Sequence, residues 1–106
     1  PLTITGDGEQ RRDFTHVDDI VSGLILMSEK KWNGKVFNLG TGVNYSINEL
    51  ASMYNSKTEY ISKRPGEAEI TLADISASKK ELGYFPSERL EDYIKNWLKA
   101  HSLKIK

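Results

Sequence analysis

The apolar residues of this chain are divided into short strand-type runs that alternate with helical stripes. Leu2 to Thr5, Lys35 to Leu39 and Thr58 to Ile61 are short runs of the kind that favours β-strands. Amphipathic helical patterns separate and follow these runs. The alternation predicts an α/β or α+β fold in which three short strands accompany about four helices.

Four helices are predicted from apolar spacing and from their boundary residues. The first spans Val17 to Glu29 behind a capping pattern, Thr15-x-x-Asp18, and the second follows the capping box from Ser46 to Glu49. The third runs to Leu82 before Gly83, and the fourth comes after Pro86. Three short strands cannot cover every apolar helix face, which indicates that a partner layer is missing.

Composition restricts the class of protein further. A length of 106 residues suits one domain, so we expect residues 1–106 to form a single unit. Fifteen basic and fifteen acidic residues give a net charge of +0, which argues against a nucleic-acid or anionic-membrane binder. The sequence has no cysteine, and this excludes disulfides and thiolate chemistry and favours the cytoplasm. No apolar run reaches the length of a membrane span.

The first residue is Pro1, and no secretion signal is recognisable behind it. Such a start indicates a fragment or a processed part of a longer protein.

Self-contained catalytic motifs are missing from the sequence. The turns Gly6-Asp7-Gly8 and Gly40-Thr41-Gly42 lack the third glycine of a dinucleotide fingerprint. No tyrosine is followed four residues later by lysine, and His16 and His101 lie too far apart for a metal-ligand pattern. We therefore expect no catalytic, cofactor-binding or metal-binding residue within this chain.

Two arginine-bearing segments remain as candidate binding sites. Arg11 and Arg12 follow a glycine turn, and Arg64 lies in a Pro-Gly loop three residues before Glu67. The arginine fork suits phosphate oxygens, and a carboxylate accepts hydrogen bonds from paired sugar hydroxyls. These residues can hold a diphosphate attached to a ribose, although arginines on surface loops are more often solvated or weakly paired. Asp13, by contrast, is interpreted as structural.

Several motifs also follow one another in a familiar order. The segment from Thr5 to Asp19 resembles the pattern Gly-Asp-Gly-x-Gln-x-Arg-Asp-Phe-x-(His/Tyr)-Val-Asp-Asp. Phe37 to Gly42, Ser46 to Leu50, Arg64 to Glu67 and the stretch from Ala73 to Tyr84 match the later motifs in sequence. Together they resemble extended short-chain dehydrogenases/reductases, which are the NAD-dependent nucleotide-sugar epimerases and dehydratases.

The resemblance implies that substrate binding and catalysis belong to different lobes of the parent enzyme. In that family the carboxyl-terminal lobe binds the nucleotide sugar, whereas an amino-terminal Rossmann lobe holds NAD and the catalytic residues. By the same resemblance, Arg12 and Arg64 contact the substrate diphosphate and Glu67 meets the nucleotide ribose. Arg11 stands where the family more often has threonine, and Glu67 stands where it often has aspartate.

The chain is thus expected to be the substrate-binding lobe of an NAD-dependent nucleotide-sugar epimerase, most specifically a UDP-sugar 4-epimerase. Its partners would be a nucleotide-diphosphate sugar and the absent Rossmann lobe, with NAD bound only in the parent enzyme. Alone, it would not be catalytically competent, and its uncovered apolar surface would cause self-association. A 4,6-dehydratase lobe and a stand-alone binding or oligomerisation module remain as alternatives.

Overall fold

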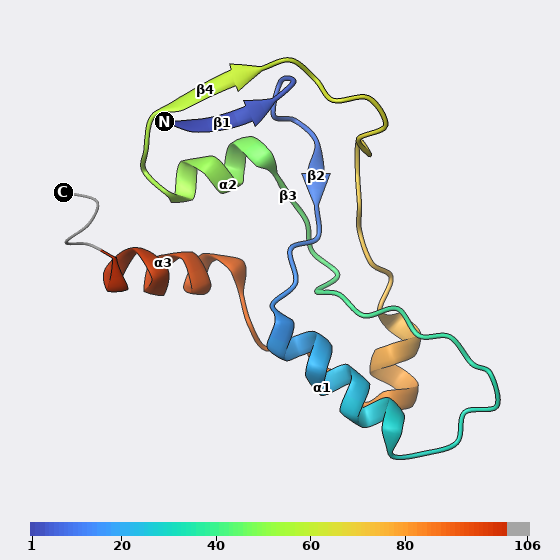
Figure 1. The fold of residues 1–106 in the computed structure, drawn as a ribbon. Helices are drawn as coiled ribbons and strands as arrows, with labels where there is room; N and C mark the ends of the chain where they lie inside the picture. The colour runs from blue at the N-terminus through green and yellow to red at the C-terminus, as the bar shows by residue number, and fades with distance from the viewer. Residues whose placement is uncertain (102–106) are drawn as a thin grey trace.

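The structure is a computed structural model in which residues 1–101 are described. These residues form a small mixed α/β fold, as the sequence predicts (Figure 1). The elements in chain order are β1 (Leu2–Thr5), β2 (Arg11–Arg12), α1 (Val17–Ser28), β3 (Tyr45–Ser46), α2 (Ile47–Met53), β4 (Thr58–Ile61), η1 (Ser78–Leu82), which is a π-helical turn, and α3 (Leu90–Ala100).

The strands form two separate pairs. β1 and β4 are parallel, with Leu2 opposite Thr58 and Thr5 opposite Ile61. β2 and β3 are antiparallel, with Arg11 opposite Ser46. Figure 1 shows β1, β4 and α2 at one end of the molecule and α1 at the other, with β2 and β3 between them. None of the helices in residues 1–101 has the length and apolar character needed to cross a lipid bilayer.

All four predicted helical segments are confirmed. The capping box of α2 forms as expected: Ser46 Oγ accepts from the Glu49 amide at 3.0 Å, and Glu49 Oε1 accepts from the Ser46 amide at 2.8 Å. Gly83 closes η1 in the left-handed conformation, at φ 70°. Asp74 Oδ1 accepts from the Ser76 amide at 3.0 Å at the start of that segment.

The predicted capping pattern of α1 is wrong by one residue. His16 is the N-cap, and its Nδ1 accepts from the Asp18 amide at 2.9 Å. The hydroxyl of Thr15 is not free to cap because it donates to Asp13 Oδ1 at 3.2 Å. Asp19 is 3% exposed, and its carboxylate accepts from the backbone amides of Ser87 and Glu88, which ties α1 to the segment before α3.

The predicted strand over Lys35 to Leu39 is also wrong, because this segment forms no strand. A strand requires hydrogen bonds to a neighbouring strand, and both strand pairs within residues 1–101 are made by other segments. Val36 is 86% exposed, whereas the adjacent Phe37 is buried. Side chains in this segment therefore still alternate between exposed and buried positions, although its backbone pairs with no strand.

The main core lies between α1, η1 and the segment around Phe37. Phe37, Ile75, Leu82 and Tyr84 form it, and the Tyr84 hydroxyl donates to the Gly40 carbonyl at 2.8 Å. Burial of the ring raises the pKa of Tyr84. Close packing extends to α1, where a Cβ on Gly23 would lie 2.6 Å from a methyl carbon of Leu39.

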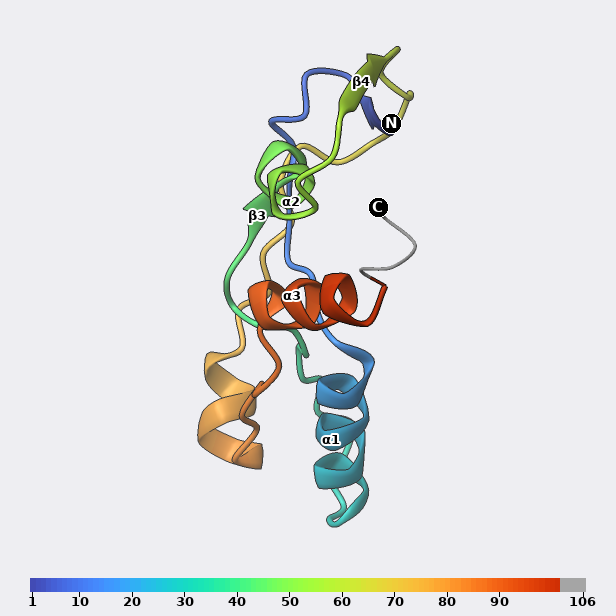
Figure 2. The ribbon, with the colours of Figure 1, turned by 90° about the vertical axis from the view of Figure 1, so that its left-hand side faces the viewer.

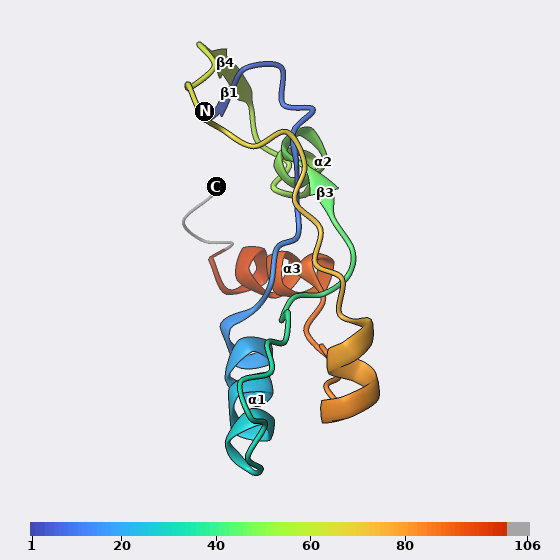
Figure 3. The same cartoon turned by 90° about the vertical axis from the view of Figure 1, so that its right-hand side faces the viewer.

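The outer face of α1 has no cover among residues 1–101. Val17, Val21, Leu24 and Ile25 on this face are 45 to 66% exposed. The molecule is also thin, with extents of 49 × 35 × 16 Å, and Figures 2 and 3 show it as a narrow stack of elements. Its radius of gyration is 16.7 Å, whereas a compact domain of this length has about 13 Å. Both observations fit a chain that packs against a further layer.

Candidate functional site

A glycine turn brings the first arginine segment back alongside the end of β1. Gly6 and Gly8 both have positive φ, 68° and 76°, which glycine adopts without strain. The turn is further fixed by Asp7, whose Oδ1 accepts from the Glu9 amide at 2.9 Å. β2 follows immediately, so Arg11 and Arg12 are strand residues and not the loop that the sequence suggests.

Each nitrogen of the Arg11 guanidinium contacts another part of the fold. Its Nε donates to Asn44 Oδ1 at 2.9 Å and its Nη2 to the Asn44 carbonyl at 3.1 Å. Its Nη1 lies 2.9 Å from Glu49 Oε1, which links β2 to the start of α2. Of the two β2 residues, Arg12 is therefore the better candidate for contact with a ligand.

Two of the three predicted site residues, Arg12 and Glu67, lie next to each other. Arg12 Nη2 lies 3.5 Å from Glu67 Oε1, and Nη1 donates to the Arg11 carbonyl at 2.8 Å. Both side chains are partly shielded, at 22% and 25% exposure. The remaining N–H groups of Arg12 can therefore meet an anion from solvent while the carboxylate stays beside it.

The carboxylate of Glu67 is held by two residues that the sequence predictions did not include. Thr5 Oγ1 donates to Oε2 at 3.0 Å, and Gln10 Nε2 donates to Oε1 at 3.2 Å. Gln10 could have been found from spacing, because it lies two residues before Arg12 in an extended segment and so shares its side. Thr5 gives no comparable signal in the sequence.

Arg64, the third predicted residue, stands apart from this group. It is exposed in the loop after β4, and it forms no ion pair within residues 1–101. The following turn is set by Gly66, at φ 77°, whose Cβ position faces open space. The guanidinium of Arg64 is therefore available to a ligand.

A shallow hollow lies beside Glu67. Its volume is about 150 Å³. The residues around it are Thr5, Gly6, Asp7, Gln10, Lys63, Glu67, Ala68 and Glu69. Pockets that enclose a drug-sized ligand usually measure 300–1,000 Å³. The hollow is thus smaller than a pocket that encloses a drug-sized ligand by itself.

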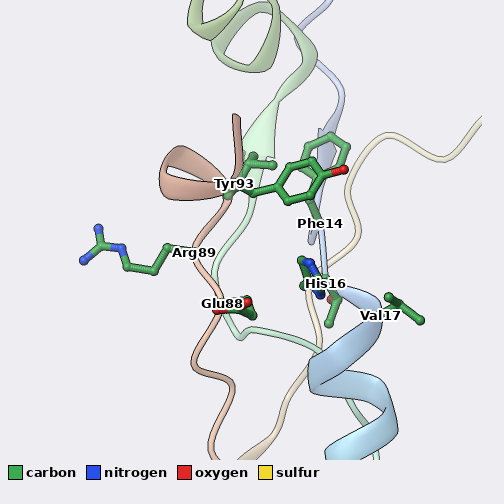
Figure 4. Close-up of a pocket in the computed structure, with 8 residues that line it drawn as sticks. Phe14, His16, Val17, Glu88, Arg89 and Tyr93 are labelled. Atoms are coloured by element: carbon green, nitrogen blue, oxygen red, sulfur yellow. The ribbon is translucent and has the colours of Figure 1, made fainter. Parts of the chain in front are cut away.

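A larger hollow of about 240 Å³ lies between the start of α1 and the start of α3. Figure 4 shows the rings of Phe14 and Tyr93 beside it, with Arg89 pointing away. None of the predicted site residues lines it. The ring of His16 packs edge-on against Tyr93, with centroids 5.4 Å apart, so this hollow is bordered by packed aromatic groups.

His16, Asp18 and Glu88 place possible ligand atoms within 4.8 Å of one another near this hollow. The Nδ1 of His16 already accepts the amide of Asp18, and both carboxylates are exposed. We assign no metal to this cluster.

Asp13 has the structural role that the sequence predicts. Its carboxylate accepts from the amides of Thr41 (3.0 Å), Gly42 (3.0 Å) and Ala73 (3.2 Å). Burial opposes its charge, but the hydrogen bonds from Thr41, Gly42 and Ala73 outweigh this and lower the pKa of Asp13. The amides of Thr41 and Gly42 are thereby occupied and are not available to a phosphate group.

Comparison with known proteins shows the family of the chain. Residues 1–97 match the family model described as GDP-mannose 4,6 dehydratase. A UDP-glucuronate 4-epimerase of Thermodesulfobacterium geofontis is 38% identical across 100% of this chain, which spans 36% of that relative.

Solved structures give the same result. A UDP-glucose 4-epimerase of Thermotoga maritima with UDP-glucose is 30% identical, with a TM-score of 0.84 over 99% of this chain and 36% of the other. A UDP-glucuronic acid 4-epimerase of Bacillus cereus, in complex with UDP-glucuronic acid and NAD, is 37% identical, with a TM-score of 0.81 over 94% and 35%. This chain thus spans about a third of the relatives it matches. It belongs to the NAD-dependent nucleotide-sugar epimerase/dehydratase family, the extended short-chain dehydrogenases/reductases.

Proposed function

We propose that this chain is the nucleotide-sugar-binding part of an NAD-dependent UDP-sugar 4-epimerase. The observation that carries the proposal is the meeting of Arg12 with Glu67, which lines a hollow, together with the exposed Arg64 on the loop that carries Glu67. The UDP-sugars named for the similar epimerase structures support a UDP-sugar as the ligand.

In the proposed site, the arginines bind and orient the part of the substrate that does not react. Arg12 and Arg64 would donate to the diphosphate oxygens, and Glu67 would accept from a ribose hydroxyl. Binding energy from such a non-reacting group can position the sugar for reaction elsewhere in the enzyme.

NAD is proposed to bind outside the described residues. The Asp18 and Glu49 amides at the starts of α1 and α2 are capped by His16 and Ser46, and the amides of Thr41 and Gly42 are taken by Asp13. We therefore assign NAD, and the hydride chemistry it would supply, to an amino-terminal Rossmann lobe outside this chain. That lobe would also cover the exposed face of α1 and complete the walls of the hollow. Alone, the chain is then expected to have no epimerase activity.

A 4,6-dehydratase is the second candidate. It is favoured by one observation, the description of the matching family as GDP-mannose 4,6 dehydratase. The two functions differ in their product, because a dehydratase eliminates water and an epimerase does not.

A chimera tests the proposal. The amino-terminal part of the Thermodesulfobacterium geofontis epimerase, joined to this chain in place of its own final third, should interconvert a UDP-sugar and its 4-epimer in the presence of NAD. Arg12→Ala should lower kcat/KM at least ten-fold, which corresponds to about 1.4 kcal/mol. Arg89→Ala is the matched control, because the Arg89 side chain is 72% exposed and lies outside the proposed site.

A chimera that folds and binds NAD but leaves the UDP-sugar unchanged would contradict the proposal. Release of water to give a 4-keto-6-deoxy product would favour the dehydratase instead. Equal activity of the Arg12→Ala and Arg89→Ala chimeras would show that Arg12 does not contribute to substrate binding.

A further inference from the structure

Donors from three separate segments converge on the carboxylate of Glu67. Thr5 reaches it from the end of β1, Gln10 from the turn before β2, and Arg12 from β2 itself. Glu67 lies more than fifty residues away in sequence, on the loop that carries Arg64. One carboxylate therefore joins the two arginine-bearing segments.

Gln10 is the most constrained member of this group. It is 9% exposed, and its Nε2 donates both to Glu67 Oε1 at 3.2 Å and to the Thr5 carbonyl at 3.0 Å. Both N–H bonds of the amide thus have acceptors, as a buried amide requires. The Thr5 hydroxyl holds the other carboxylate oxygen, so Glu67 is fixed on both sides.

The count of hydrogen-bonding directions leaves room for a ligand. A carboxylate has about four lone-pair directions, and the hydrogen bonds from Thr5 and Gln10 take two of them. At least one direction remains for a hydroxyl group, even with the Arg12 guanidinium nearby. The 3.5 Å separation from Arg12 Nη2 is long for a charged pair, so the guanidinium is held near the carboxylate without being neutralised by a close contact.

We infer that Thr5 and Gln10 are positioning residues of the nucleotide-sugar site, which hold Glu67 at a set distance from Arg12 and anchor the loop that carries Arg64. The inference rests on the proposed function, in which Glu67 meets the ribose and the arginines meet the diphosphate. Without the two donors, Glu67 would close on Arg12 as its only partner and compete with the diphosphate.

Two substitutions separate this role from simple packing. Gln10→Glu keeps the shape of the side chain but replaces the donor by a second carboxylate, which repels Glu67 at pH 7. At pH 5 a proton shared by the two carboxyl groups restores a hydrogen bond between them. Thr5→Val keeps the shape and loses the hydroxyl, whereas Thr5→Ser keeps the hydroxyl.

The experiment is a titration of the 106-residue chain with UDP and, separately, with pyrophosphate, followed by amide NMR shifts. Gln10→Glu should weaken UDP binding about ten-fold at pH 7, the scale of one charge-assisted hydrogen bond, and should recover most of this loss at pH 5. Thr5→Val should weaken it about three-fold or more, and Thr5→Ser should bind as the wild type does. Both weakened variants should also lose preference for UDP over pyrophosphate. Asn38→Asp, an amide-to-acid change at an exposed position, is the matched control.

Wild-type UDP affinity and selectivity in Gln10→Glu and Thr5→Val, together with a loss in Arg12→Ala, would overturn the inference and leave the proposed function standing. No binding of UDP by the wild type, or equal binding by Arg12→Ala, would overturn both. If the spectrum of Gln10→Glu shows an unfolded chain, the comparison of Thr5→Val with Thr5→Ser decides the question.

Discussion

Replacing Asp13 by alanine should destabilise this chain more than the loss of any exposed carboxylate. The carboxylate accepts three backbone amides, those of Thr41, Gly42 and Ala73, and it also binds the hydroxyls of Thr15 and Thr41. It therefore fixes the start of α1 against two loops that are 28 and 60 residues away in sequence.

The magnitude follows from the amides that would lose their acceptor. Hydrogen bonds to a charged group contribute about 1.5–3 kcal/mol each when buried. Asp13 is only partly buried, so water can replace part of each bond, and about 1 kcal/mol per backbone amide is a better figure. The two hydroxyls can turn to solvent, so together they add at most about 1 kcal/mol. Asp13→Ala should thus lower the free energy of unfolding by about 3–4 kcal/mol, out of the 5–15 kcal/mol typical of a domain.

Urea denaturation followed by the fluorescence of Trp32, which packs against the main core, measures this loss. With an m-value of about 2 kcal/mol/M, the midpoint should fall by about 1.5–2 M. Asp7→Ala is the control, because Asp7 accepts one amide in an exposed turn, and its loss should cost about 0.5–1 kcal/mol. Equal midpoints for the Asp13→Ala and Asp7→Ala variants would refute the reasoning.

Three further predictions concern pH, packing and association. The lowered pKa of Asp13 contributes stability that is complete above its ordinary value of 3.8 and is lost as the pH falls through its lower value in the folded chain. In an acid titration followed by circular dichroism, Asp13→Asn should therefore lose less folded structure below pH 4 than the wild type. Identical curves would contradict this. Gly40→Ala should cost about 1–3 kcal/mol in urea denaturation, because its Cβ would lie 2.5 Å from the Cβ of Ala73; an unchanged midpoint would show that the loop can move aside. The isolated chain should self-associate with rising concentration through the exposed face of α1. In light scattering, Leu24→Lys should reduce the self-association, whereas Leu72→Lys, at a similarly exposed leucine, should not. A wild-type monomer at every concentration would count against the prediction.

The features that the sequence predicts correctly are those set by neighbouring residues. The capping box of Ser46 and Glu49 and the left-handed Gly83 are local arrangements, and both are present. The run from Lys35 to Leu39 has strand-type residues, but strand formation depends on a distant partner that residues 1–101 do not provide. β2 also depends on a distant partner, and here the structure provides one, the two-residue strand β3.

The site shows the same division. Arg12 and Glu67 were predicted through motifs, and the structure brings them together. Gln10 was not predicted as part of the site, although its spacing from Arg12 was a usable signal; its contact with Glu67 is seen only in the structure. Arg11 and Arg12 are adjacent and chemically identical; the family motif assigned the binding role to Arg12, and the structure adds the physical reason, because Asn44 and Glu49 engage Arg11.

A titration of the isotope-labelled chain with UDP-glucose, followed by amide NMR shifts, tests the proposed role most directly. Weak binding, with a Kd of roughly 0.1–10 mM, is expected from a site with one wall. The shifts should lie in residues 5–12 and 63–69 and should disappear in the Arg12→Ala, Arg64→Ala double variant. Shifts confined to the hollow between Phe14 and Tyr93, or the same affinity in the double variant, would contradict the assignment of this chain's nucleotide-sugar site.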